Sequence, residues 1–251
     1  MTKETVRIAP APAPGRLLAR PGPTAAKAKA PKGRRPLGVG AERDGILYVP
    51  EGYDPRLPAP LALMLHGAGG RAAHAIDPFS ELADEHGVLL LAPDARASTW
   101  DIIVGDGFGP DLAFIDDALG RVFAGYAVDP SRVAAGGFSD GASYALSLGL
   151  TNGDLFGHLL AFSPGFAAPE APRGAPLVYV SHGRRDEVLP IEACSRALVP
   201  RLRRAGYQVQ YREFDGPHTV PRDLAREAFA WFARGMTPPS ARGARESTRR
   251  P

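Results

Sequence analysis

The residues best suited to chemistry form the pentapeptide Gly137-Phe138-Ser139-Asp140-Gly141, in which glycines stand two residues before and two after a serine. An apolar segment at 132–138 leads into it and a helical pattern at 142–150 follows, so the turn joins a predicted strand to a predicted helix. Small residues allow such a turn to be tight and to expose the serine hydroxyl. The pattern predicts Ser139 as a nucleophile; a glycine-rich turn that contains a serine by chance is the alternative.

A serine hydroxyl needs a general base, and three histidines follow Ser139 in the chain. His158 stands before an apolar run, and His182 ends another. His218 lies in a loop between an alternating segment at 207–214 and the last helical pattern, where it could reach the nucleophile. We therefore predict His218 as the base and expect His182 to pack or hydrogen-bond at its own turn.

The base needs a carboxylate that orients the imidazole. Asp186 follows the apolar run 177–181 in a loop at a strand end, and it is the candidate acid. Glu187 and Asp215 are the alternatives, although Asp215 lies so close to His218 that capping of its own loop also explains it.

The segment His66-Gly67-Ala68-Gly69-Gly70 follows the apolar run 61–65. Attack of a serine on a carbonyl creates an oxyanion, which backbone N–H groups stabilise when small residues let the main chain approach. We predict the N–H of Ala68, or of Gly67, as one donor and the N–H of Asp140 as the other. His66 is expected to be structural.

The rest of the central region alternates between short apolar runs and helical patterns. Uninterrupted apolar strands that alternate with helices predict a mostly parallel sheet covered on both faces, an α/β fold in which sites form beyond the carboxyl ends of the strands. The predicted strands are 46–49, 61–65, 88–92, 132–138, 159–162, 177–181 and 207–214, and the predicted helices are 80–86, 111–126, 142–150, 190–205 and 223–233.

These pieces resemble the α/β-hydrolase superfamily, and within it the phospholipase/carboxylesterase group, which is similar to polyhydroxybutyrate-depolymerase-like esterases. The likeness spans roughly 46–234 and rests on LALMLHGAGG, VLLLAPDA, AVDPSRVAAGGFSDGAS, LLAFSPG, SHGRRDEVLP and GPHTV. It implies a catalytic triad of Ser139, Asp186 and His218 that works without cofactor or metal. The chain departs from many relatives at Asp140, where they carry a smaller or amide side chain.

The resemblance implies a serine carboxylesterase. Only 47 residues separate Ser139 from Asp186 and 32 separate Asp186 from His218, which leaves no room for an inserted lid domain. An open site favours small or medium soluble esters, and we expect Trp100 and Phe108, in the loop 94–110, to line the substrate pocket. A thioesterase or peptidase-like acyl hydrolase is the alternative enzyme. A degenerate hydrolase that acts as a binding module is the alternative of another class.

Charge divides the 251 residues into three parts. Residues 1–36 carry nine Lys/Arg and one acid, residues 237–251 carry four Arg and one Glu, and the remaining body carries 17 basic and 25 acidic side chains. We predict a flexible Pro/Ala-rich arm at 1–36 without a secretory signal, a single domain at 37–236 and a flexible tail at 237–251. A loosely docked first strand is the alternative for the arm. The acidic body argues against nucleic acid as a partner.

Two further exclusions follow from composition. The apolar runs are far shorter than the roughly 18 residues that span a bilayer, so no stable membrane insertion is expected. The single cysteine, Cys194, excludes an intrachain disulfide and a cysteine-based zinc site. It favours a reducing, cytoplasmic compartment.

Overall fold

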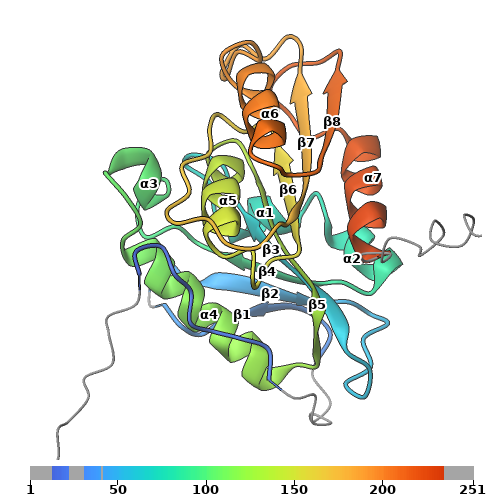
Figure 1. The fold of residues 1–251 in the computed structure, drawn as a ribbon. Coiled ribbons are helices and arrows are strands. Elements are labelled where there is room, and N and C mark those ends of the chain that lie inside the picture. Colours follow the sequence, from blue (N-terminus) through green and yellow to red (C-terminus); the bar gives the residue numbers. More distant parts are fainter. Residues whose placement is uncertain (1–12, 23–30, 41, 235–251) are drawn as a thin grey trace, which may run out of the picture.

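The computed structural model of the chain describes residues 13–22, 31–40 and 42–234, which form a layered α/β structure around one eight-stranded sheet (Figure 1). The strand order across the sheet is β1-β2-β4-β3-β5-β6-β7-β8. The strands are β1 (Gly33–Pro36), β2 (Gly45–Val49), β3 (Ala59–Leu65), β4 (Leu89–Pro93), β5 (Val128–Phe138), β6 (His158–Phe162), β7 (Leu177–Gly183) and β8 (Val209–Phe214).

The six strands β3 to β8 run parallel to one another. Strands β1 and β2 are added at one edge as antiparallel neighbours. Every residue of β3, β4 and β6 is buried, which is why these strands are continuous apolar runs in the sequence. The prediction of an α/β-hydrolase fold with a mostly parallel sheet is confirmed.

Helices cover both faces of this sheet (Figure 1). Alternate residues of β3 supply the two cores: Leu63 packs with α4 and α5 on one face, and Met64 packs with α1, α2 and α7 on the other. The helices are α1 (Ala72–Ile76), α2 (Ser80–His86), α3 (Asp101–Val104), α4 (Pro110–Gly125), α5 (Asp140–Thr151), α6 (Ser195–Arg204) and α7 (Arg222–Ala233).

The structure corrects three predicted elements. The helix predicted at 190–205 begins only at Ser195, because the preceding residues form turns. Helix α3 lies in the segment predicted as the loop 94–110, and α1 lies in a segment without a predicted element, because helices of four or five residues are too short to show a period. Strand β1 lies within the segment predicted as a flexible arm.

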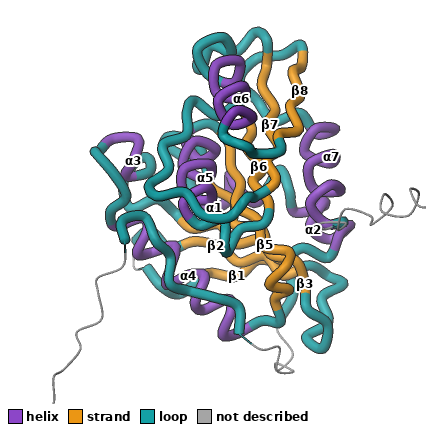
Figure 2. Tube along the Cα trace, in the orientation of Figure 1, coloured by secondary structure: helices purple, strands orange, loops and turns teal. Residues whose placement is uncertain are grey.

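Residues 13–22, which we call the N-terminal strap, also correct the prediction of a flexible arm (Figure 2). The strap has no regular structure, yet Leu17 is only 1% exposed and belongs to the core beside α4 and α5. Asn152 accepts a hydrogen bond from the Leu17 N–H at 3.0 Å, and Asp116 accepts from the next two N–H groups at 2.7 and 2.8 Å. The predicted boundary at 37 is therefore too late. Residues 1–12 and 23–30 of the predicted arm and the predicted tail at 237–251 lie outside the described residues.

His158, at the start of β6, is a buried polar group. Its side chain is inaccessible to solvent, and neither ring nitrogen has a hydrogen-bond partner among the residues that the structure describes. Trp231 and Phe232 of α7 pack against the imidazole with ring centroids 4.9 and 5.3 Å away. Burial lowers the pKa of His158 from 6.5 to about 4.

Cys194 is buried and carries a free thiol. Among the residues that the structure describes, no helix is both long and apolar enough to cross a bilayer.

Candidate active site

Ser139 occupies a strained turn between β5 and α5. Its φ of 58° lies in the left-handed region that side chains avoid, and its side chain is 7% exposed. A Cβ at Gly137 would lie 2.6 Å from the carbonyl oxygen of Leu65, and one at Gly141 would collide with the same carbonyl. The two glycines are therefore required where the turn crosses the end of β3, as the pattern predicts.

Asp186 and His218 come together at the carboxyl ends of the next strands. Asp186 follows β7, and His218 lies in the loop between β8 and α7. The imidazole Nδ1 of His218 lies 2.6 Å from Oδ2 of Asp186. This short contact fixes the tautomer with the proton on Nδ1, so Nε2 is the nitrogen free to accept a proton.

The carboxylate of Asp186 is held on both oxygens. Its Oδ1 accepts from the N–H groups of Val188 and Leu189 at 3.0 and 2.8 Å. Burial alone would raise the pKa of Asp186, but the Leu189 N–H, His218 and the Val188 N–H together bring it below its usual value. The carboxylate is therefore ionised at neutral pH.

The competing acids lie elsewhere. Glu187 is exposed, and Asp215 is exposed and pairs with Arg185 at 2.6 Å. Only Asp186 among the three candidates contacts His218 in the described part of the chain.

His182 is a second histidine on the same carboxylate. Its Nε2 lies 2.8 Å from the Leu189 carbonyl and 3.2 Å from Oδ2 of Asp186, and its Nδ1 lies 2.7 Å from the hydroxyl of Ser195. Burial lowers the pKa of His182, so the ring is neutral, with Nε2 donating and Nδ1 accepting. His182 thus hydrogen-bonds at its turn as expected; its contact with the acid could not be read from spacing.

His218 and the nucleophile are neighbours but are not hydrogen-bonded. The ring of His218 lies over that of Phe138, the residue before Ser139, with centroids 4.5 Å apart. Within residues 42–234 no hydrogen bond joins the Ser139 hydroxyl to the imidazole. Catalytic hydrogen bonds of this kind are commonly long without substrate and tighten when it binds.

The predicted oxyanion donors flank Ser139. A Cβ at Gly67 would lie 3.4 Å from the Cβ of Ser139, so this main chain runs directly beside the nucleophile. The N–H groups of Ala68 and Asp140 have no acceptor among the described residues, whereas the Gly69 N–H is bound to the carbonyl of Ser98 at 2.8 Å. These two N–H groups are therefore available, and their role stays a prediction.

His66 fixes the shape of this turn. It is 1% exposed, its Nδ1 lies 2.8 Å from the Gly67 carbonyl, and its Nε2 accepts from the Ala95 N–H at 3.0 Å. Burial lowers the pKa of His66, which agrees with a neutral ring in this arrangement. The ring is structural, as expected.

The prediction that Trp100 and Phe108 line the substrate pocket is wrong for Trp100. Its side chain is wholly buried in the core, and its Nε1 donates to the His66 carbonyl at 2.8 Å. Trp100 therefore helps to fix the turn His66–Gly70, which carries the predicted oxyanion donor and which we call the oxyanion turn. Phe108 packs edge-on against Tyr144 with centroids 5.4 Å apart and lies against Gly15 of the strap. Aromatic type and loop position could not separate these packing roles from a pocket lining.

The side chain of Asp140 has its own partner. The hydroxyl of Thr99, 7% exposed, donates to its Oδ2 at 2.6 Å. The carboxylate that distinguishes this chain from many relatives is thus held by the loop before α3. Sequence reasoning did not single out Thr99, and no pattern in the chain marks it.

Throughout the described ranges, no group of three or more His, Cys, Asp or Glu side chains is placed to hold a metal ion. Ser139, His218 and Asp186 instead follow β5, β8 and β7, at the strand ends where a nucleophile, a base and an orienting acid are predicted. The fold is the α/β-hydrolase fold.

Comparisons with known proteins agree with that class. No family model matches the chain. Feruloyl esterase C of Emericella nidulans is 28% identical over 158 residues, which cover 60% of this chain and 57% of that protein. A Nocardia uniformis protein named as an esterase, NocK, is 30% identical over 218 residues, covering 77% of this chain and 62% of the relative. The chain thus spans about three fifths of the length of the curated relatives it matches.

Solved structures show the same fold. The crystal structure of esterase PE8 superposes with a TM-score of 0.64 at 22% identity, over 78% of this chain and all of the other. The carboxylesterase of Bacillus cereus gives 0.59 at 19% identity, over 78% of this chain and 95% of the other. These likenesses confirm the α/β-hydrolase fold that the motifs predict.

Proposed function

We propose that this protein is a serine carboxylesterase that hydrolyses small or medium soluble esters through an acyl-enzyme on Ser139. The observation that carries the proposal is the 2.6 Å contact between Asp186 and His218, formed beside a serine on a strained strand-to-helix turn. The names of the relatives support ester hydrolysis as the reaction.

The proposed reaction has two halves. Ser139 Oγ attacks the carbonyl carbon while its proton passes to Nε2 of His218, and Asp186 stabilises the imidazolium through Nδ1–H. The N–H groups of Ala68 and Asp140 donate to the developing oxyanion. Collapse of this intermediate breaks the ester C–O bond, and the leaving oxygen takes the proton from Nε2. Water then attacks the acyl-enzyme with the same groups, which releases the acid and restores Ser139.

An apolar rim beside the triad supports apolar ester groups as substrates. Val188, whose N–H binds Asp186, is 66% exposed, and Phe166 is 37% exposed. The segment before Phe166 is tied to the nucleophile helix, because the Gly165 N–H donates to the Ser143 hydroxyl at 2.9 Å. Each methylene buried on such a surface contributes about 0.8 kcal/mol, or roughly a fourfold gain in binding.

A chain-length series tests this rim. We expect kcat/KM to rise with acyl length for aryl esters, and Phe166→Ala to flatten the rise. Leu57→Ala, which removes another exposed apolar side chain (65%), serves as the control. An unchanged slope in Phe166→Ala would refute the role of the rim while leaving ester hydrolysis intact.

The central experiment is intact-mass labelling with a fluorophosphonate probe. We expect stoichiometric labelling of the wild type and none of Ser139→Ala, in which kcat should fall by roughly 10⁴–10⁶-fold with little change in substrate affinity. Asp186→Asn should lower kcat about 10⁴-fold, whereas Asp215→Asn should leave it near the wild-type value. Failure of the folded wild type to be labelled would refute the proposal and favour a binding module.

A thioesterase or peptidase-like acyl hydrolase would use the same triad, so matched ester, thioester and amide substrates decide between these leaving groups.

We propose a small-molecule ester as the partner, with no nucleic acid bound by the folded body. We also propose a cytoplasmic location, which the single, unpaired Cys194 supports. Thiol-specific labelling of the unfolded native protein would test the reduced state.

A further inference from the structure

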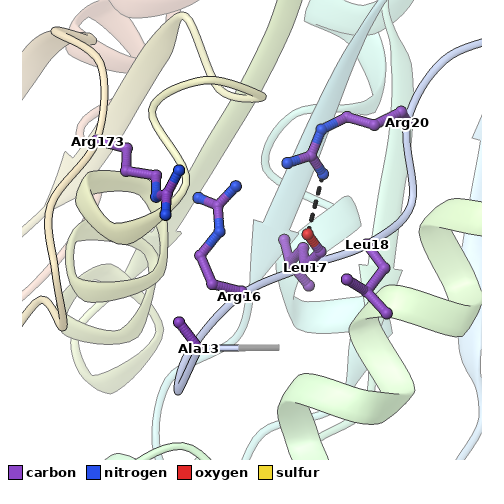
Figure 3. Close-up of a pocket in the computed structure, with 6 residues that line it drawn as sticks. All are labelled: Ala13, Arg16, Leu17, Leu18, Arg20 and Arg173. Carbon is purple, nitrogen blue, oxygen red and sulfur yellow. Dashed lines mark hydrogen bonds between the residues drawn. The ribbon is translucent and has the colours of Figure 1, made fainter. Parts of the chain in front are cut away.

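Three arginines gather on the face of the molecule where the N-terminal strap crosses the end of α5. A surface pocket of about 320 Å³ is lined there by Ala13, Arg16, Leu17, Leu18, Arg20 and Arg173. Figure 3 shows the side chains of Arg16 and Arg173 extending toward one another from the strap and from the loop before β7. Like charges directed at each other call for a negative group between or beside them.

The strap holds its two arginines in fixed positions. Arg16 donates two hydrogen bonds of 2.7 Å to the carboxylate of Asp154 and one of 2.8 Å to the Thr151 carbonyl. Arg20 donates to Asp154 at 2.9 Å and to the Leu17 carbonyl at 3.1 Å. Because the strap is itself anchored by Leu17, these guanidinium groups are pre-organised before any ligand binds.

Asp154 does not balance the charge of the pocket. Its hydrogen bonds with Arg16 and, secondarily, Arg20 hold the pKa of Asp154 well below its usual range, so it contributes one negative charge at neutral pH. Asp154 pairs with Arg16 and Arg20, and Asp116 lies against the N–H groups of Leu18 and Ala19, so the guanidinium of Arg173 is the one without a paired carboxylate among the described residues that line the pocket. A bound anion would supply its counter-charge.

Donors also remain unused. The guanidinium of Arg173 has no hydrogen bond or ion pair with any described residue, so its whole fork is available. Arg16 already covers the carbonyl at the end of α5, which removes the negative helix end as an obstacle to an anion. Planar arginine forks are the preferred donors for phosphate oxygens.

We propose that the pocket formed by Arg16, Arg20 and Arg173 binds a phosphate group, either as inorganic phosphate or as a small phosphate monoester. The site is separate from the triad. Asp140 and Thr151 stand at opposite ends of α5, eleven residues apart, which is about 16 Å along a helix. Ligand binding there can therefore be measured independently of the proposed esterase activity.

Calorimetric titration tests the proposal on the full chain, with sodium phosphate at neutral pH and sodium chloride at equal ionic strength as the reference. We expect saturable binding of one phosphate per chain and none of chloride. Arg173→Gln should weaken phosphate binding about tenfold, because it removes a charge-assisted pair of hydrogen bonds. Arg201→Gln removes another exposed arginine, on α6, and should leave the affinity unchanged.

Glycerol phosphate and glycerol distinguish the two sources of the group. Binding of inorganic phosphate alone supports a free-phosphate site, and binding of glycerol phosphate as well supports a monoester site; glycerol should not bind in either case. Absence of saturable phosphate binding to the wild type would overturn the proposal. Equal weakening by Arg173→Gln and Arg201→Gln would overturn it too, since it would show a non-specific charge effect.

Discussion

His158 should make the protein lose stability in mild acid. Both of its ring nitrogens are buried without partners in the described part of the chain, and its pKa in the folded protein is about 4 against 6.5 for an ordinary histidine. Between these two pH values His158 is protonated in the unfolded chain but neutral in the folded protein. The free energy of unfolding therefore falls as pH falls through this window. The loss begins near pH 6.5 and is complete below pH 4.

The size of the effect follows from the two pKa values. A difference of about 2.5 units corresponds to roughly 3 kcal/mol in full, of which about 2 kcal/mol is lost on going from pH 7.5 to pH 5. His158→Leu keeps a similar volume against Trp231 and removes the titration. The variant should therefore lose about 2 kcal/mol less than the wild type over this range, whatever its stability at pH 7.5.

Urea unfolding followed by circular dichroism at the two pH values measures this difference. Other groups titrate equally in both proteins, so only the difference in pH dependence between them counts. His74→Gln, a change at an exposed histidine, is the matched control and should follow the wild type. If His158→Leu loses stability in acid as steeply as the wild type, the burial of a neutral His158 is refuted.

Three further predictions concern other parts of the structure. Leu17→Ala should destabilise the protein by about 3 kcal/mol, measured by urea unfolding, whereas Leu18→Ala next to it, at a 66% exposed position, should change little. Trp100→Phe should lower kcat about tenfold with KM nearly unchanged, because it frees the His66 carbonyl and loosens the oxyanion turn; an equal change in KM would contradict this. His182→Gln should lower kcat about tenfold at constant fluorophosphonate stoichiometry, and a normal kcat would show that Asp186 needs no second support.

The sequence predicted the parts of the site that depend on strand ends and turn chemistry. The glycines around Ser139 and the position of Asp186 after a buried strand are local signals, and both residues lie where the pattern put them. Contacts such as Thr99 with Asp140, or Trp100 with the His66 carbonyl, join segments about 35 to 40 residues apart. No local pattern encodes which polar atoms meet across such a distance.

The N-terminal strap shows the same limit more strongly. Its composition is that of a chain that buries little, yet one buried leucine, the partners Asp116 and Asn152, and the ion pairs with Asp154 anchor it. Composition describes the average hydrophobicity of the segment, whereas its anchoring depends on a single residue, Leu17, that fits into the core. The position of strand β1 could not be predicted for a similar reason, because GRRP has no apolar run and pairs only along the edge of the sheet.

The strap also has a consequence for the order in which the chain folds. Its residues are made about 135 residues before Asn152 and Asp154, so the strap cannot dock until most of the sheet has been made. Closing so long a loop is slow, and until then the core surface that receives Leu17 is uncovered. A recombinant chain begun at residue 37 would never cover it, and should aggregate more readily than one that keeps residues 13–22.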